Sequence, residues 1–277
     1  MSENIDEKNG KKYLRISVSK AKTFHQCKNQ FKFNYIDKLP KITRDYHVLG
    51  TFCHKVLEDF HKSYINGSIK PFNEELTVAW KAACEESKKN LTPEIKAEAR
   101  TMMNGYLDRI SKQKANGTLE KVLGVEDNFK IDLDEKVLLN GMIDRVQQDS
   151  DGMLHIADYK STKNKKYLKD DFFQLLTYSY VILSENPELE KVRASYILLR
   201  HDFEYITKVF TREEAMKVKD IFLQYYEDMN AETEYPANPT MLCHWCDYLE
   251  YCEEGQVIDA QKFGQKIDNS KFGEVKW

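Results

Sequence analysis

The sequence lacks any apolar run approaching the 20 or so residues that a membrane-spanning helix needs. It also lacks an apolar leader, because its first twelve residues are mostly polar or charged, so we expect a cytoplasmic setting. Neither charge sign is in large excess, since the formal net charge is −3. This excludes a whole-molecule field that attracts nucleic acid, and any such contact must use local basic strips. Internal repeats and low-complexity segments are absent too.

The composition is that of a globular protein. The 277 residues are 41% hydrophobic and 31% charged, which is enough apolar material to bury a real core. This length suits one large domain or two small ones. Six cysteines in a chain without a secretion signal indicate metal or redox chemistry before disulfides.

Hydrophobic periodicity divides the chain into helices and strands. It predicts helices over residues 20–39, 49–65, 73–90, 93–115, 169–184 and 212–229. It predicts strands over residues 119–133, 136–147, 154–160, 192–200 and 203–210. Ser19 and Thr211 are the expected caps of the first and last helices, and residues 1–16 and 256–277 read as tails. This order of elements indicates an α/β or α+β fold, with a sheet covered by helices.

The twenty residues from Gly141 to Lys160 read as a β-hairpin. Turn-forming residues at 149–152 separate two apolar-rich runs. Asp144 and Asp158 each lie seven residues from Asp151, so a turn centred there places them opposite each other on adjacent strands. A register shift of one residue would send one of the aspartates to the other face of the sheet.

Acidic side chains and an amine on one apolar strand face make a poor core and a good cation site. Opposed residues have Cβ atoms roughly 5 Å apart, where like charges repel. A hard divalent ion takes oxygen ligands and neutralises Asp144 and Asp158. Lys160 shares the face of Asp158 because side chains alternate along a strand. Glu126, in the preceding strand, is either a third carboxylate of this site or a surface residue.

Two features follow the hairpin. The first is a dense basic run, in which Lys163, Lys165 and Lys166 are either solvated surface or contacts to a phosphate backbone. The second lies in the next predicted helix, where Gln174 and Tyr178 are four residues apart and therefore share a face.

Three cysteines lie within ten residues of one another near the C-terminal end. The C-x₂-C-x₅-C pattern is formed by Cys243, Cys246 and Cys252. They are one ligand short of the four that a tetrahedral zinc or a cubane iron–sulfur cluster takes, and spacing alone does not separate the two. Cys27, among aromatic residues of the first predicted helix, is the best candidate for the fourth ligand. Cys53 and His244 are weaker candidates, and a disulfide is the less favoured alternative.

Together these residues resemble the RecB-type branch of the PD-(D/E)xK nuclease superfamily. Within it they are most similar to the iron–sulfur members, which include AddB-type nuclease domains and RecB-like CRISPR-associated exonucleases. The resemblance covers residues from about 17 to 255. The matching motifs are G-x-x-x-H from Gly50 to His54, G-x-x-D-R at Asp144, D-x-K at Asp158 and Lys160, Q-x-x-x-Y at Gln174 and Tyr178, and cysteines at 27, 243, 246 and 252. Ile143 stands where the superfamily's name has a proline.

The resemblance implies a restriction-endonuclease-like fold, with a central mixed sheet flanked by helices. It implies a single nuclease domain over residues 17–255. Within this domain we expect a helical insertion at about 66–118, a nuclease core at about 119–210 and a cysteine segment at about 236–255 that closes on Cys27.

The resemblance also implies chemistry and partners. It implies hydrolysis of DNA by an exonuclease that favours single strands or free ends, with Mg²⁺ or Mn²⁺ and a structural [4Fe-4S] cluster in preference to zinc. A helicase, a recombination or CRISPR protein, or a second copy of the chain would be a partner. Two alternatives stay open: a catalytically silent DNA-binding or scaffolding subunit, and a zinc-stapled nucleic-acid-binding module.

The resemblance gives roles to individual residues. The implied metal ligands are His54, Asp144, Asp158 and the carbonyl group of Tyr159. Lys160 would act on the attacking water. Gln174 and Tyr178 would position the lysine or the substrate.

Overall fold

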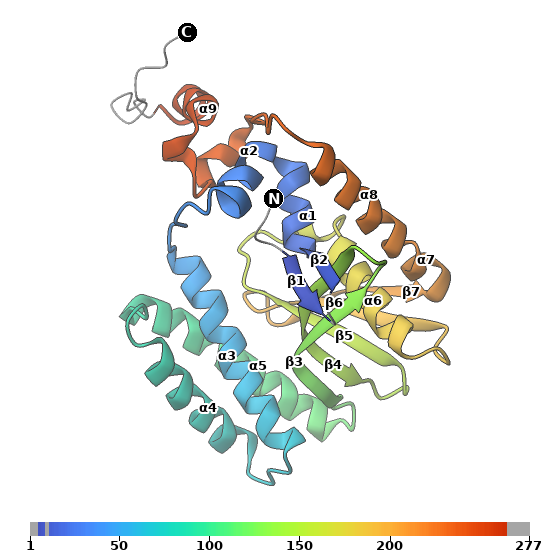
Figure 1. Ribbon diagram of the computed structural model, residues 1–277. Helices are drawn as coiled ribbons and strands as arrows, with labels where there is room; N and C mark the ends of the chain where they lie inside the picture. Colours follow the sequence, from blue (N-terminus) through green and yellow to red (C-terminus); the bar gives the residue numbers. More distant parts are fainter. Residues whose placement is uncertain (1–4, 9–10, 265–277) are drawn as a thin grey trace. The chain divides into compact units, whose positions relative to one another are not determined.

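The structure is a computed structural model that describes residues 5–8 and 11–264 (Figure 1). The chain forms two compact units. The first comprises residues 1–42, 132–139 and 220–277, and the second comprises residues 43–131 and 140–219. Among the described residues, no helix has both the length and the apolar character needed to cross a membrane.

The first unit contains a short stretch of sheet. Strand β2 (Lys11–Ile16) pairs antiparallel with β1 (Ile5–Lys8) and parallel with the first three residues of β4 (Val137–Gln148). The sequence pattern predicted a polar tail over residues 1–16, of which 1–4 and 9–10 lie outside the described residues. Residues 11–16 form a strand instead, and Ile16 at its end is completely buried in the core. The segment is too short to show a periodic hydrophobic pattern in the sequence.

The remaining elements of the first unit are mostly helical. They are α1 (Val18–Gln26), α2 (Lys28–Phe31), the π-helical turn η1 (Lys32–Ile36), most of α8 (Val218–Ala231), the 3₁₀ turns η3 (Met241–Trp245) and η4 (Leu249–Tyr251), and α9 (Glu253–Phe263). The prediction of one continuous helix over residues 20–39 is wrong, because the backbone becomes extended at Cys27. The prediction of Ser19 as cap is wrong too, since Ser17 accepts the Lys20 N–H.

The predicted C-terminal tail begins as part of a helix. Residues 256–263 belong to α9, whose first turn is capped by the Cys252 side chain. The part of the predicted tail from residue 265 onward lies outside the described residues.

Three helices of the second unit pack side by side (Figure 1). They are α3 (Asp45–Ile65), α4 (Phe72–Ser87) and α5 (Pro93–Ala115). Thr92 caps α5 and a proline occupies its first position, which favours a helix start there. Their apolar faces share one core, in which Phe52, Leu57 and Met103 are almost completely buried.

The second unit also holds the mixed sheet that the sequence predicted. Its strands are β3 (Lys121–Asp132), the rest of β4, β5 (Leu154–Lys160), β6 (Lys191–Leu198) and β7 (Glu204–Thr211). The order is β4-β5-β6-β7, with β3 paired to β4, and only the β5–β6 pairing is parallel along that four-strand path. Arg145 pairs with Ala157, which confirms the register centred on Asp151.

Alternation along β5 directs its side chains to two helical layers. Ala157 and Tyr159 share the core of α3 and α5. Asp158 and Lys160 contact Gln174 on α6 (Phe173–Glu185), which packs against β5 and β6. Helix α6 begins later than predicted, because a 3₁₀ turn, η2 (Lys166–Leu168), precedes it. Helix α7 (Arg212–Met216) begins with a capping box at Thr211, which confirms that cap.

Candidate functional site

The first motif brings helix α3 against the end of strand β5. A Cβ atom on Gly50 would lie 3.2 Å from the Ser161 Oγ, which is a tight contact. One helical turn later, His54 Nε2 lies 3.2 Å from the Tyr159 carbonyl oxygen. The glycine therefore allows the close approach that places the histidine at the strand end.

His54, Glu126 and Asp144 form a group in which the potential ligand atoms all lie within 4.8 Å of one another. His54 Nδ1 is 3.5 Å from Asp144 Oδ2 and 3.7 Å from Glu126 Oε1. The exposed fractions of the His54, Asp144 and Glu126 side chains are 29%, 12% and 18%, so each is largely shielded yet still reachable from solvent. One imidazole and two carboxylates suit a divalent cation.

Glu126 reaches this group through an irregular backbone. Its φ angle of 50° lies in the left-handed region, which is uncommon for a residue with a side chain. Such an outlier within β3 re-aims the side chain, as bulges next to functional sites do. The sequence left Glu126 open between a third carboxylate and a surface residue, and the structure places it beside His54 and Asp144.

The glycine of the G-x-x-D-R motif also has a local explanation. A Cβ atom on Gly141 would lie 2.6 Å from the Phe129 ring, so only glycine fits without displacing that ring. Phe129 in turn packs edge-on against Tyr178, with ring centroids 6.0 Å apart. The motif therefore lets β3 cross close to β4, three residues before Asp144.

A hydrogen-bonded chain links the second aspartate to α6. Gln174 Nε2 donates to Asp158 Oδ1 and to the Tyr178 hydroxyl group, both at 2.8 Å. Lys160 Nζ donates to Gln174 Oε1 at 3.0 Å and lies 2.6 Å from Asp158 Oδ2. The structure thus brings together four residues that the sequence singled out.

Asp158 stands apart from the histidine group. It is not among the residues whose ligand atoms all lie within 4.8 Å of one another. Its Oδ2 atom is buried and accepts no aligned hydrogen bond, although the Lys160 ammonium group is close to it. In this structure the charge of the Lys160 ammonium group compensates this buried carboxylate oxygen.

Burial and neighbouring charges shift the pKa values of Asp144 and His54. Burial, reinforced by the charge of Asp158, raises the pKa of Asp144 to about 7. Burial alone would lower the pKa of His54. The hydrogen bond to Glu126 and the charges of Asp144 and Asp158 outweigh burial and raise this pKa to about 9. Neighbouring negative charge contributes to both pKa shifts, and a bound cation would compensate that charge.

The lysines of the basic run after β5 differ in their surroundings. Lys165 forms an ion pair with Glu204, whereas the side chains of Lys163 and Lys166 are exposed to solvent. The latter two are therefore the better placed to contact a phosphate backbone.

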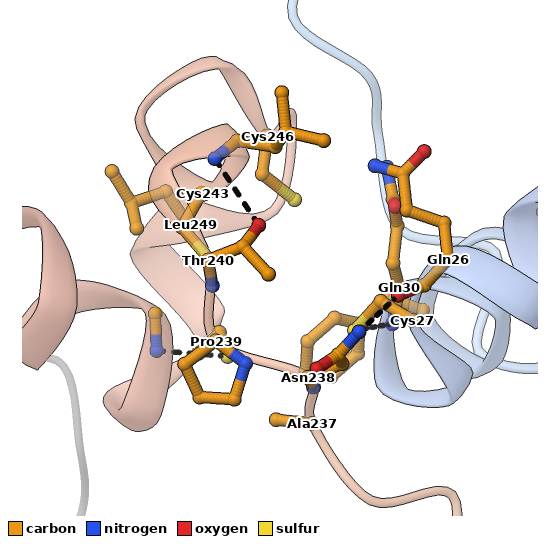
Figure 2. Close-up of a pocket in the computed structure, with 14 residues that line it drawn as sticks. Gln26, Cys27, Gln30, Ala237, Asn238, Pro239, Thr240, Cys243, Cys246 and Leu249 are labelled. Atoms are coloured by element: carbon orange, nitrogen blue, oxygen red, sulfur yellow. Dashed lines mark hydrogen bonds between the residues drawn. The ribbon is translucent and has the colours of Figure 1, made fainter.

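The cysteine pattern converges within the first unit (Figure 2). Cys27, Cys243, Cys246 and Cys252 all line one cavity and are free thiols. The N–H groups of Gln30 and Asn238 donate to Cys27 Sγ, each at 3.4 Å.

The two weaker candidates for the fourth ligand lie elsewhere. Cys53 is buried in the core of the second unit. His244 lies 2.8 Å from Asp259 through Nδ1, a hydrogen bond that occupies this ring nitrogen. The structure therefore favours Cys27 over both.

The spacing of the four sulfur atoms is wider than zinc requires. A tetrahedral Zn²⁺ with Zn–S bonds of about 2.3 Å would hold its sulfurs about 3.8 Å apart. Within the described chain, no three of these sulfurs lie within 4.8 Å of one another. Burial raises the pKa of Cys252 to about 11 and also raises that of Cys246, so metal uptake must displace their protons.

A sequence model of the PD-(D/E)XK nuclease superfamily matches residues 15–253. The chain belongs to this superfamily. The match confirms the resemblance drawn from the motifs, and the mixed sheet with helices on both faces is the expected fold.

Two curated relatives of this chain are much longer proteins. A subunit of an ATP-dependent helicase/deoxyribonuclease from Streptococcus agalactiae is 28% identical over 290 residues, which covers 94% of this chain and 25% of the relative. The corresponding subunit from Streptococcus uberis is 31% identical over 159 residues, which covers 54% of this chain and 14% of the relative. The chain thus spans about a quarter or less of the length of these relatives.

A solved structure from Eubacterium rectale, named as a candidate exonuclease, has a similar fold. It superposes with a TM-score of 0.50 at 12% identity and covers 84% of this chain and 86% of that one. This likeness shows the fold alone.

Proposed function

We propose that this chain is a divalent-metal-dependent deoxyribonuclease that works as an exonuclease on single-stranded DNA or free DNA ends. The observation that carries the proposal is the position of Lys160, whose amine lies 2.6 Å from Asp158 and is held by Gln174. If Asp158 had only a structural role, it would not need a lysine that a glutamine side chain holds in place next to it, with Asp144 as a second acidic group nearby. The deoxyribonuclease names of the Streptococcus relatives support DNA as the substrate.

The donor set fits Mg²⁺ or Mn²⁺. His54, Glu126, Asp144 and Asp158 would hold the ion, and the Tyr159 carbonyl oxygen next to His54 is a further oxygen donor. When bound, such an ion polarises the scissile phosphate and lowers the pKa of an attacking water. The raised pKa of Asp144 is consistent with a site built for that charge.

The chain's own groups then act on the substrate. Lys160 would orient the attacking water and stabilise negative charge that develops on the phosphate. Gln174 would hold the lysine and Asp158 in one geometry, because it hydrogen-bonds to both. Tyr178 would fix Gln174 from the other side. Lys163 and Lys166 would bind the DNA backbone beside the cleaved bond.

The cysteine cavity would hold a [4Fe-4S] cluster with a structural role. A cubane cluster takes four cysteine ligands, and these four cysteines line one cavity. Cys27 is 216 residues from Cys243 in the sequence, so the cluster would tie distant parts of the first unit together.

A helicase would be the natural partner of such a nuclease. The relatives are subunits of helicase/deoxyribonuclease enzymes, and a helicase supplies the single strands that an exonuclease consumes.

Replacement of the site lysine tests the proposal. The purified protein should degrade end-labelled single-stranded DNA with Mg²⁺ or Mn²⁺ and stop on chelation. Lys160→Ala should fold normally and lose at least about 100-fold in rate, as expected for a group that acts on the reacting water. Lys112→Ala, on the exposed face of α5, is the matched control and should be fully active.

Two outcomes would contradict the proposal. Full activity in Lys160→Ala would reject the site. A wild-type protein that binds DNA but does not cleave it with either ion would instead favour the catalytically silent subunit.

A further inference from the structure

A second cavity, of about 470 Å³, opens in the same unit as the metal group but uses different residues. Its walls come from α3, the start of α4, α5, the first residues of β3 with the two residues before it, and β4, and they are mainly aromatic and aliphatic. The walls include Phe60, Tyr64, Phe72, Ile110 and Leu123. This volume lies within the range of about 300–1,000 Å³ that is typical of small-molecule sites.

One wall of this cavity contains a buried cation. Arg145 is 2% exposed and lines the cavity. Its Nη1 donates to the hydroxyl groups of Tyr159 at 3.1 Å and Tyr106 at 3.3 Å, and its Nη2 donates to the Tyr205 hydroxyl group at 3.1 Å. Its Nε is buried without a hydrogen-bond partner.

All of these partners are neutral. In the described part of the chain, Arg145 forms no ion pair with a carboxylate. Glu120 also lines the cavity, but it is linked to Arg145 only through the Tyr205 hydroxyl group, which donates to Glu120 Oε1 at 3.2 Å. A buried charge is costly unless an opposite charge compensates it. An anion seated in the cavity would supply the missing negative charge.

The cavity and the metal group lie on opposite faces of β4. Asp144 and Arg145 are consecutive residues of that strand, and successive side chains of a strand point to opposite faces. Tyr159 nevertheless touches both sites. Its N–H donates to Asp144 Oδ2 at 2.8 Å, while its hydroxyl group accepts from Arg145.

We propose that this cavity binds an organic anion with a flat aromatic body, of the nucleoside monophosphate class. Phe60, Tyr64 and Phe72 pack edge-on against one another along the cavity and offer an aromatic wall for a base. Arg145 at the wall and Lys121 at the rim offer the positive charge that a phosphate needs. The choice of a nucleotide rests on the proposed function, because nucleotides and short oligonucleotides are the products of DNA hydrolysis.

Calorimetric titration of the full chain in EDTA tests the inference without cleavage. The probes are dAMP, deoxyadenosine and inorganic phosphate. dAMP should bind with one site per chain, and the other two probes should bind at least about tenfold more weakly, because each satisfies only the aromatic walls or only the cation. The same titration on Lys160→Ala should give unchanged dAMP affinity, because that residue lies outside the cavity.

Two variants locate the bound nucleotide. Leu123→Trp fills the partly exposed mouth of the cavity and should weaken dAMP binding at least about tenfold. Val78→Trp adds the same ring at an exposed position of α4 outside the cavity, and its dAMP affinity should match that of the wild type. Arg145→Met should also lose dAMP binding. If Arg145→Met does not fold, Leu123→Trp still tests the inference.

Absence of dAMP binding, or equal affinity in Leu123→Trp and wild type, would overturn the inference. Loss of binding in Lys160→Ala with retention in Leu123→Trp would place the nucleotide at the metal group and would overturn it too. Failure of the nuclease assay alone would not, because these titrations measure binding in the absence of metal and cleavage.

Discussion

Lys160 and Gln174 form a hydrogen bond of 3.0 Å that fixes the amine between an amide oxygen and a carboxylate. The amide nitrogen of the same glutamine donates to Asp158 and Tyr178, so its oxygen must face the lysine. The Q-x-x-x-Y motif is thus a device that orients the D-x-K motif from a neighbouring helix. Its effect on the reaction would pass through Lys160 and Asp158.

Gln174→Ala should therefore reduce kcat and leave the KM for DNA nearly unchanged. The loss should be about 10- to 100-fold, the usual effect of removing a group that orients an active residue. Steady-state kinetics on labelled single-stranded DNA measure both parameters. Tyr178→Phe is the matched control, because it removes only an acceptor from the same glutamine and should cost less. A larger loss in Tyr178→Phe would contradict this role.

Glu126→Gln should weaken metal binding while the fold is retained. It removes one of the carboxylates in the group that includes His54 and Asp144, and a neutral amide is a poorer ligand for Mg²⁺. The concentration of Mg²⁺ that gives half-maximal cleavage should rise at least about tenfold. Asp127→Asn, at the exposed neighbouring position outside the group, should leave that concentration unchanged. An unaltered metal requirement in Glu126→Gln would remove it from the site.

The metal-free protein should lose stability as pH rises from 6 to 9. A group with a higher pKa in the folded protein binds its proton more tightly there, so the free energy of unfolding falls across the interval between its two pKa values. For Asp144 this interval runs from a pKa of 3.8 to a pKa of about 7, and for His54 it runs from 6.5 to about 9. Thermal unfolding in EDTA at several pH values measures the slope.

Two controls accompany this pH series. Asp144→Asn should flatten the dependence below pH 7, because the substituted amide does not titrate. Saturating Mg²⁺ should weaken or reverse the dependence, since the ion compensates the ionised carboxylates. Stability that rises between pH 6 and 9 in EDTA would show that the charges of this site are not coupled as described.

Cys252→Ser should remove iron and colour from protein purified without oxygen and should lower its thermal stability. The loss follows because one of four cluster ligands is missing and the segments around Cys27 and Cys243 are no longer tied. Metal analysis and absorption spectra measure the effect. Cys84→Ser, outside the cavity, should keep both iron and colour. One zinc per chain with no iron would defeat the cluster proposal.

Much of the second unit was predictable from local chemistry. The hairpin register followed from turn formers around Asp151, and Gly152 indeed adopts a left-handed φ of 82°. Helix α7 followed from the cap at Thr211. These signals were reliable because each depends on residues adjacent in the chain.

Other features depend on contacts that no local pattern encodes. The predicted helix through Cys27 ends there, because the thiol accepts the Gln30 N–H and starts a new helix. Glu126 was left undecided, since its direction depends on a single left-handed residue within a strand. Arg145 went unnoticed apart from its place in a motif, because its three tyrosine partners come from three separate elements, α5, β5 and β7.

Cys27 Sγ receives N–H groups from Gln30 and from Asn238, the second of which is 211 residues away along the chain. Cys252 Sγ likewise accepts the Gly255 N–H at 3.3 Å. Backbone donors from segments more than 200 residues apart therefore already hold these sulfurs in place. A group that binds these sulfurs would therefore find its ligands already positioned by the backbone, so that little ordering would be needed on binding.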